Sequence, residues 1–370
     1  MNMPTTSIKQ PLPPLKPGDK VIDGKYEIIE LTSNPGGFGR IYRAYGNEKN
    51  NDGSRHISAI KEFYVSEFGC NPRFSSMQSY TICETRTKLD ILRTKFYEEV
   101  RTLSILYRQN DNHQPKIEEP VWNGPNGRLL YAMNFVEGST LRELMESHEK
   151  GYTMSEKEAV GYIVQIGKVL HKAHTNGLVH ADVSPNNIMV KKDHDYAVLV
   201  DWGNSKSYNE DLAISCLHNA NGNDIVSRCK ADLDSKIRSF CSRYGVVSYE
   251  RPRIETIGYT APSSFWGKPQ SDVYSLAATL FYLLTGSQHT DARRFIRFRR
   301  ELKYGISVSD ICAEKDYQLL KEHKVSPTTI CAIQHALNDN LEQTTQSIQD
   351  FLAELPQDIV ISTLLKYQDQ

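Results

Sequence analysis

Short runs of residues that favour β-strands indicate that the first third of the chain is rich in strands. Such runs lie at residues 26–31, 41–45 and 57–61, and a fourth extends from 129 to 136. Residues 34–39 (Asn-Pro-Gly-Gly-Phe-Gly) separate the first two runs and are rich in turn-forming types. We therefore expect a hairpin with a glycine-rich turn, followed by further strands.

Helical periodicity interrupts these strands once and then dominates the rest of the chain. One helix within the β-rich part is predicted by apolar residues at helical spacing, namely Phe96, Val100, Leu103 and Tyr107. A later amphipathic helix is predicted by Ile163, Ile166 and Leu170. Two short strands, 188–190 and 198–200, follow it, and a strongly apolar helix is predicted from Asp272 to a stop at Gly286. The order predicts an α+β protein with a small β-rich lobe and a larger α-rich lobe.

The same pattern divides the chain into two lobes with a tail at each end. We expect the small lobe over residues 25–136, the large lobe over 137–355 and a C-terminal tail over 356–370. The first twenty residues hold five prolines and no apolar run of a secretory signal, so residues 1–24 are expected to form a flexible tail. Residues 11–17 are compatible with an SH3-like groove, although a solvated leader is the simpler interpretation.

Composition narrows the classes of function. The 370 residues include 44 Lys and Arg and 45 Asp and Glu, so the net charge is −1, which argues against a protein that coats nucleic acid. Seven cysteines, an odd number without a C-x-x-C pair, indicate reduced thiols and a cytoplasmic protein. The longest apolar run, 276–284, is about half of the ~20 residues that a membrane-spanning helix needs. Export as an effector, by a route without a cleavable signal, would leave no trace here.

Two features of the β-rich part suit phosphate chemistry. Gly36, Gly37 and Gly39 allow backbone N–H groups to approach a phosphate, although glycine-rich turns are common. Lys61 lies within an apolar strand, where a buried ammonium needs an anionic partner or ligand. Glu99 on the predicted helix is a candidate partner, and an exposed edge-strand lysine is the alternative.

A third constellation suits a divalent cation. The segment from His180 contains Asp182 and Asn187, and the next strand leads to Asp201. A short hairpin between them would bring these three side chains together. Carboxylate and amide oxygens are hard ligands of the kind that Mg²⁺ prefers.

In this order the segments resemble the signature elements of the eukaryotic-type protein kinase family. The matching elements are the glycine-rich loop at 34–39, Lys61, Glu99, His180-Ala-Asp182 with Asn187, Asp201-Trp-Gly203, Ala261-Pro-Ser263 and Asp272. The resemblance covers roughly residues 25–355. It implies a bilobal kinase fold, with ATP and Mg²⁺ as cofactors and Mn²⁺ as a substitute ion.

The resemblance also implies a role for each position. Lys61 would hold the α- and β-phosphates and pair with Glu99, while Asp182 would orient the acceptor hydroxyl and receive its proton. Asn187 and Asp201 would hold the metal. The implied nucleotide-binding set is Gly36, Gly37, Phe38, Gly39, Ile41, Ala59, Lys61, Met133, Asn134 and Val136, with Met133 as the gatekeeper and 134–136 as the hinge.

Thr256 indicates which kind of hydroxyl would accept the phosphoryl group. It falls where the Ser/Thr members of the family carry a threonine that contacts the catalytic aspartate, so the implied acceptor is a Ser or Thr hydroxyl of a protein.

The sequence departs from the family pattern at several positions. Asn34 replaces the first glycine of the loop. Ala181 stands where the family often has an arginine that binds the phosphorylated activation loop. Ser184 stands where a lysine is usual, which is similar to RIO-type atypical kinases. Ser263 replaces a glutamate whose arginine partner is also missing, because Thr344 occupies that position.

Two further segments do not belong to the core pattern. Residues 201–263 form an unusually long activation segment, whose metal-ligating types are Cys216, His218, Cys229 and Cys241; their spacing argues against structural zinc. Residues 291–303 would place Arg293, Arg297 and Arg300 on one helix face. A solvated face is the simplest interpretation, and an acidic partner or anionic surface is the alternative.

The leading hypothesis is an active ATP- and Mg²⁺-dependent Ser/Thr protein kinase that acts on protein substrates. A pseudokinase scaffold is a rival, but a scaffold has no need of the whole set of polar residues. A small-molecule kinase of the aminoglycoside or choline type is a second rival, and the 259–262 and 272–276 segments argue against it.

Overall fold

The chain forms two compact units, each described here by itself. The computed structural model describes residues 12–32, 39–50, 52–64, 82–107, 113–149, 151–191, 196–209, 259–288 and 309–367. Among these, the first unit holds the residues up to Ser104 together with 116–135. The second unit holds 105–115 and everything described from Val136 onward. The α+β fold class predicted from the sequence is confirmed.

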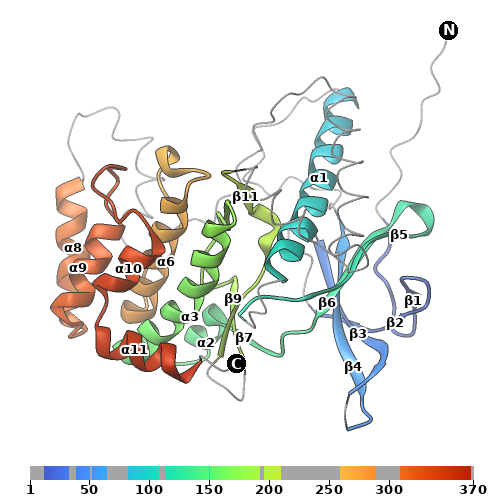
Figure 1. Cartoon of the computed structure of the whole chain (residues 1–370), viewed down its shortest axis with the longest axis horizontal. Coiled ribbons are helices and arrows are strands. Elements are labelled where there is room, and N and C mark those ends of the chain that lie inside the picture. Colours follow the sequence, from blue (N-terminus) through green and yellow to red (C-terminus); the bar gives the residue numbers. More distant parts are fainter. Residues whose placement is uncertain are drawn as a thin grey trace. The chain divides into compact units, whose positions relative to one another are not determined.

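A six-stranded antiparallel sheet forms the first unit (Figure 1). Its order is β1-β2-β3-β4-β6-β5. The strands are β1 (Lys20–Val21), β2 (Tyr26–Leu31), β3 (Gly39–Lys49), β4 (Arg55–Phe63), β5 (Ile117–Asn123) and β6 (Leu129–Asn134). The four predicted strands correspond to β2, β3, β4 and β6. The sequence pattern missed β5 because it contains two adjacent glutamates and a proline, a composition that is tolerated at the edge of a sheet, where β5 lies.

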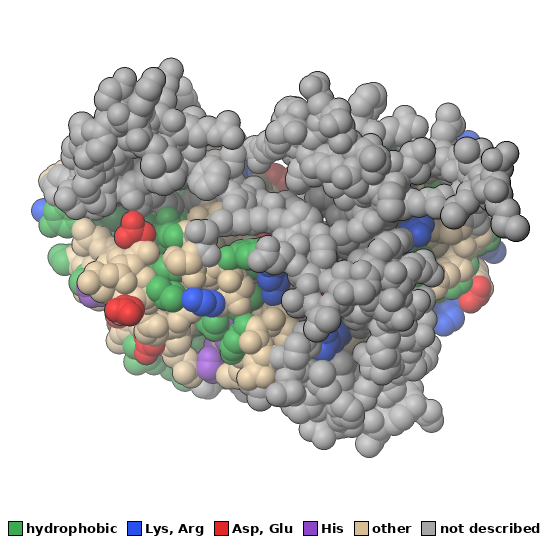
Figure 2. Space-filling view, turned by 90° about the horizontal axis from the view of Figure 1, so that it is seen from above, with side chains coloured by type: hydrophobic (Ala, Val, Ile, Leu, Met, Phe, Trp, Pro, Cys, Tyr) green, Lys and Arg blue, Asp and Glu red, His purple; other side chains and the backbone are tan. Residues whose placement is uncertain are grey.

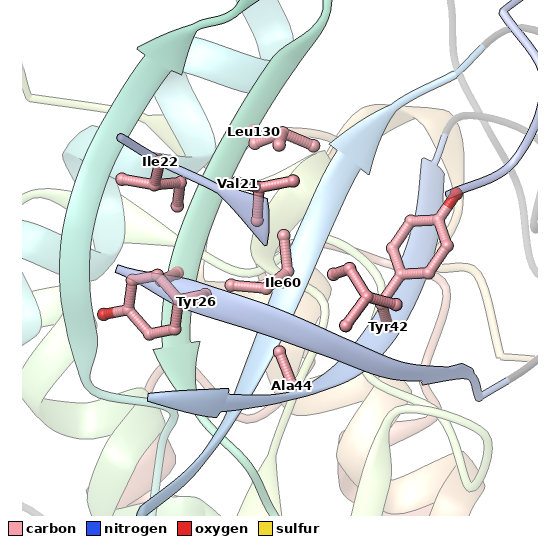
Figure 3. Close-up of a cluster of buried hydrophobic side chains, with 9 residues drawn as sticks. Val21, Ile22, Tyr26, Tyr42, Ala44, Ile60 and Leu130 are labelled. Carbon is pink, nitrogen blue, oxygen red and sulfur yellow. The ribbon is translucent and has the colours of Figure 1, made fainter. Parts of the chain in front are cut away.

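An apolar cluster on one face of the sheet joins β1 to the other strands (Figure 3). Its members are Val21, Ile22, Tyr26, Ile28, Tyr42, Ala44, Ile60, Leu130 and Ala132. Val21 and Ile22 are only 4% and 3% exposed. The expected tail over residues 1–24 was therefore wrong for residues 20–24, since this apolar pair gains more from burial than a solvated leader could.

Residues 12–17, called the N-terminal segment below, are also held against the sheet. Arg40 Nη1 donates to the carbonyl of Leu12 at 2.9 Å, and Arg128 Nη2 donates to that of Pro13 at 2.9 Å. The backbone N–H of Leu15 donates to the Tyr42 hydroxyl at 3.2 Å. The proline-rich motif is thus engaged by its own sheet.

Helix α1 (Ile82–Tyr107) supplies the helix predicted within this part of the chain. Phe96, Val100 and Leu103 are buried as the spacing predicts, whereas Tyr107 is 39% exposed. The helix begins well before Phe96, the first residue of the predicted apolar face, because residues 82–88 contain good helix formers such as Glu84, Arg86 and Lys88.

The second unit is mainly helical. Its helices are α2 (Leu141–Glu146), α3 (Glu156–Thr175), α6 (Pro269–Thr285), α8 (Ser309–Glu322), α9 (Pro327–Ala336), α10 (Ile348–Glu354) and α11 (Gln357–Lys366). Its strands are β7 (Gly138–Thr140), β8 (Leu178–Val179), β9 (Ile188–Lys191), β10 (Tyr196–Leu199) and β11 (Lys206–Ser207). Helix α6 is buried from Ser271 to Thr285 and packs against α3, and Gly286 ends it with a left-handed φ of 66°, as predicted.

The C-terminal tail expected over residues 356–370 was wrong for residues 357–367, because α11 packs on α3. Val360 and Tyr367 are 4% and 6% exposed. The Tyr367 ring meets the Tyr196 ring edge-on, with the ring centroids 5.8 Å apart. The segment carries enough apolar side chains to form an amphipathic helix, so it joins the core.

The described surface mixes charges of both signs. On the face drawn in Figure 2, side chains of both signs occur among the coloured residues, in keeping with the net charge of −1. In the part of the chain that the structure describes, no helix is both long and apolar enough to cross a bilayer.

Candidate active site

A buried ion pair joins β4 to α1 in the first unit. Lys61 Nζ lies 2.6 Å from Glu99 Oε1, and the two side chains are 11% and 4% exposed. A buried ammonium is stable only beside an anion, so Glu99 keeps Lys61 charged and fixes its direction. The pairing that the sequence suggested is present, and its role towards phosphate stays a prediction.

The strands beside Lys61 carry the other described members of the expected nucleotide set. Ile41 is paired with Lys61 across β3 and β4, and Ala59 is paired with Met133 across β4 and β6. A Cβ added to Gly39 would lie 3.3 Å from Lys61 Cε and from the Glu62 carbonyl. The absence of a side chain at Gly39 therefore leaves room for the Lys61 side chain beside β3.

The expected hinge, residues 134–136, is divided between the units, with Asn134 and Phe135 in the first and Val136 in the second. Asn134 belongs to the first unit, where its backbone N–H donates to the Lys116 carbonyl at 3.0 Å and its Oδ1 accepts from the Lys116 N–H at 2.5 Å. Val136 belongs to the second unit, where it is buried with Tyr196, Val198 and Tyr367.

Several sequence-predicted residues lie outside the described residues. These are Asn34, Gly36, Gly37, Phe38, Thr256, the basic positions Arg293, Arg297 and Arg300, and Cys216, His218, Cys229 and Cys241. The remaining candidates of the second unit are all described.

In the second unit, Asp182 is held by amide donors. Asn187 Nδ2 donates to the Asp182 backbone carbonyl at 2.8 Å and to its Oδ2 at 3.2 Å. Asn204 Nδ2 donates to the same Oδ2 at 3.1 Å. These amide donors hold the carboxylate in one direction, which suits a group that must orient a hydroxyl and accept its proton.

The predicted hairpin does bring Asn187 near Asp201. Strands β9 and β10 are paired, and the Val200 N–H donates to the Asn187 carbonyl at 2.8 Å. Asp201 follows with φ 58° and ψ 71°, a left-handed conformation that costs an ordinary residue roughly 1–3 kcal/mol and is found mostly at functional sites. Its side chain is exposed.

The donor chemistry of these residues fits a divalent cation. The Asn187 amide nitrogen is used inside the loop, so its carbonyl oxygen is the end that remains to act as a ligand. Asp201 adds a carboxylate, and both are hard oxygen donors. No cluster of three His, Cys, Asp or Glu side chains suited to a metal is found among the described residues, so a metal here would depend on an asparagine and on oxygens from its substrate.

Asp272 anchors the loop that carries Asp182, a role that sequence reasoning did not assign. Its Oδ2 accepts from the His180 N–H at 2.9 Å and its Oδ1 from the Ala181 N–H at 2.8 Å. His174 Nε2 lies 2.8 Å from Oδ2 as well, and the Asp272 side chain is fully buried. The available signal was an acidic residue in the first turn of an otherwise apolar helix.

The same anchor meets the loop at a position that departs from the family pattern. Ala181 has a φ of 62°, so the loop turns through a left-handed residue at the position where its N–H meets Asp272. His180 Nε2 lies 3.2 Å from the Val200 carbonyl, and the His180 ring meets Trp202 edge-on at 4.6 Å. These contacts join the Asp182 loop to the Asp201 turn.

The other departures are accommodated by small polar side chains. Ser184 is fully buried, and its Oγ has no hydrogen-bond partner among the described residues. Thr344 Oγ1 donates to the carbonyls of His335 and Ala336 at 3.3 and 3.2 Å, so backbone hydrogen bonds occupy the position where the family has an ion-pair arginine.

A sheet with a buried lysine–glutamate pair, together with a helical unit that carries an Asp–Asn loop and a second Asp, defines the kinase class of phosphotransferases. The family model described as the protein kinase domain matches residues 36–355. The chain therefore belongs to the protein kinase domain family.

The curated relatives that the chain resembles are named as serine/threonine-protein kinases. PknD of Mycobacterium tuberculosis is 24% identical over 267 residues, which are 71% of this chain and 30% of the relative. PknB of Mycolicibacterium smegmatis is 29% identical over 166 residues, or 44% of this chain and 21% of the relative. A probable serine/threonine-protein kinase of Clostridium acetobutylicum is 31% identical over 137 residues, or 34% and 19%. The chain spans less than a third of the length of these relatives.

Proposed function

We propose that this kinase domain transfers the γ-phosphoryl group of ATP to Ser or Thr hydroxyls of proteins and needs Mg²⁺. The observation that supports this most is that the Lys61–Glu99 pair and the aspartates at 182 and 201 are all retained. Lys61 and Glu99 are paired in the first unit, and Asp182 is held by Asn187 and Asn204 in the second. A pure scaffold gains nothing from such buried, costly charges.

Each residue has one task in this proposal. Lys61, aimed by Glu99, binds the α- and β-phosphates, and Asp182 orients the acceptor hydroxyl and takes its proton. Asn187 and Asp201 hold Mg²⁺, which when bound neutralises charge on the phosphates. Because the protein forms no bond to the phosphoryl group, positioning and fixed charge supply most of the acceleration. The names of the relatives support Ser or Thr as the acceptor.

A phosphotransfer assay with matched controls tests the proposal. The purified chain is incubated with labelled ATP, Mg²⁺ and a generic protein substrate, beside Lys61→Ala and Asp182→Asn. Lys25→Ala is the control for the first variant, because Lys25 also pairs with a glutamate at 2.6 Å but is 48% exposed. We expect label on protein Ser and Thr, lost by at least about a hundredfold in both site variants and kept in the control.

Other outcomes of this assay would contradict the proposal. ATP binding without transfer would indicate a pseudokinase. Transfer only to small hydroxyl compounds would indicate a small-molecule kinase, and label on tyrosine alone would remove the Ser/Thr assignment.

A further inference from the structure

A thiol, an imidazole and a carboxylate lie in line on the surface of the second unit, away from the loops of the candidate active site. Cys331 and His335 occupy successive turns of α9, and Glu354 is the last residue of α10. His335 Nε2 lies 3.5 Å from Cys331 Sγ, and His335 Nδ1 lies 2.7 Å from Glu354 Oε2.

The partners of the imidazole decide how its two nitrogens are used. Glu354 can only accept at Nδ1, so that nitrogen carries the proton and donates it to the carboxylate. Nε2 is then the unprotonated nitrogen, and its lone pair faces the thiol. This is the arrangement in which an imidazole acts as a general base towards a nucleophile while a third group orients it.

The neighbouring backbone and side chains hold this arrangement. Thr345 Oγ1 donates to the second oxygen of Glu354 at 3.4 Å, and Thr344 Oγ1 donates to the His335 carbonyl at 3.3 Å. Ile330 and Ile333 turn the opposite face of α9 into the core, being 4% and 1% exposed. An addition to Cys331 therefore leaves the packing of α9 in place.

A reactive thiol must also be accessible to solvent, and Cys331 meets this condition. Cys331 is a free, exposed cysteine, and the side chains of His335 and Glu354 are 57% and 32% exposed. Because the three side chains are open to solvent, a small, solvent-borne reactant can reach the thiol. The described cluster also does not form a metal site.

We propose that Cys331, activated by His335 and Glu354, is a modification site for small disulfides. Cys331 Sγ attacks one sulfur of a disulfide R–S–S–R, while His335 Nε2 accepts the thiol proton. A new S–S bond forms between Cys331 Sγ and the attacked sulfur, which keeps its bond to R. The original S–S bond of the small disulfide breaks. The leaving thiolate takes the proton from His335 and departs as R–SH, so atoms and electrons balance.

Rates of mixed-disulfide formation test the proposal. The full chain is incubated with bis(2-hydroxyethyl) disulfide at neutral pH, and the adduct on the Cys331 peptide is quantified over time by mass spectrometry. His335→Gln keeps a polar amide but removes the base, and Glu354→Gln removes the orienting charge. The exposed His323, near the end of α8, supplies the control His323→Gln.

We expect the rate at Cys331 to fall on the order of tenfold in His335→Gln and several-fold in Glu354→Gln, and to stay unchanged in His323→Gln. Circular dichroism of each variant should match that of the parent, because all three side chains are on the surface. An unchanged rate in His335→Gln, an equal loss in the control, or the absence of an adduct at Cys331 in the parent chain would overturn the proposal.

Discussion

Lys61 and Glu62 are neighbours on β4, yet they bind partners on opposite faces of the sheet. Lys61 pairs with Glu99 of α1, whereas Glu62 pairs with Arg40 and Arg128 and accepts a hydrogen bond of 2.6 Å from the Tyr42 hydroxyl. Successive side chains of a strand point to opposite faces, so this one dipeptide fixes β4 from both sides.

Removing the charge of Glu62 should therefore destabilise the first unit. Glu62→Gln leaves Arg40 and Arg128 buried without their anion, and we expect a loss of about 3–5 kcal/mol in the free energy of unfolding. Chemical denaturation measures it. The control is Glu27→Gln, whose partner Arg55 is 40% exposed, with an expected loss of under about 1 kcal/mol. Equal losses in the two variants would contradict this assignment.

Deletion of residues 1–17 should loosen the same region. It removes the carbonyls of Leu12 and Pro13 that accept from Arg40 and Arg128, together with the N–H of Leu15 that donates to Tyr42. Net values of about 1 kcal/mol for each hydrogen bond, more for those from charged donors, predict a loss of a few kcal/mol. Amide hydrogen exchange should rise in β3, β4 and β6 but not in α3 or α6. Unchanged exchange in β4 would show that the segment adds nothing.

Alkaline pH should weaken the fold through Tyr42. Burial and the hydrogen bond to Glu62 raise its pKa from 10.0 to about 12. Between these two values the unfolded chain loses the phenol proton while the folded chain retains it, so stability is complete below pH 10 and falls as the pH rises towards 12. Denaturation curves at pH 9 and pH 11 should differ less in Tyr42→Phe than in the parent chain. The exposed Tyr107→Phe serves as the control and should keep the parent's difference.

Asp272→Asn should disturb the geometry of the Asp182 loop and so lower kcat, while the KM for ATP changes less. The amide can accept only part of what the carboxylate accepts from His180, Ala181 and His174. We expect a loss of about 2–4 kcal/mol in stability and a lower kcat, with the KM for ATP changed less because Lys61 and Glu99 are untouched. Steady-state kinetics separate the two constants. The exposed Asp358→Asn is the control, and a rise in KM alone would contradict the prediction.

Ser184→Ala should cost little stability. The buried Ser184 hydroxyl has no hydrogen-bond partner among the described residues, so no hydrogen bond offsets the cost of removing it from water. We expect Ser184→Ala to leave the free energy of unfolding unchanged or to raise it by up to about 1 kcal/mol. Ser275→Ala is the matched control. Its Oγ bonds the carbonyls of Tyr259 and Ser271 at 2.6 and 2.8 Å, and its loss should destabilise by about 1 kcal/mol. If Ser184→Ala lowers kcat at unchanged stability, the hydroxyl acts in the reaction.

The sequence was sufficient where a pattern is local. Residue types that favour strands predicted the strand that carries Lys61. Helical spacing predicted the helix with Phe96 and Val100, and glycine predicted the helix end at Gly286. The family match over residues 36–355 also agrees with the order of motifs read from the chain.

The remaining features depend on contacts between distant segments. Nothing near Asp272 in the sequence shows that its carboxylate meets the N–H groups of His180 and Ala181. Val21 is buried by strands that are distant in the sequence, including β6. The proline-rich composition of the first residues had instead predicted a flexible tail. The roles assigned to Gly36, Gly37, Phe38 and Thr256 remain predictions, because these residues lie outside the described part of the chain.

Helix α11 also bears on the order in which the second unit can mature. Tyr367 closes over Tyr196 and Val198, the strand residues that lead directly to Asp201. A ribosome that has translated only as far as Leu355 has therefore produced every candidate catalytic side chain but not the cover of β10. We therefore expect the apolar cover of β10, the strand that leads to Asp201, to form during synthesis only after residues 357–367 have emerged from the ribosome.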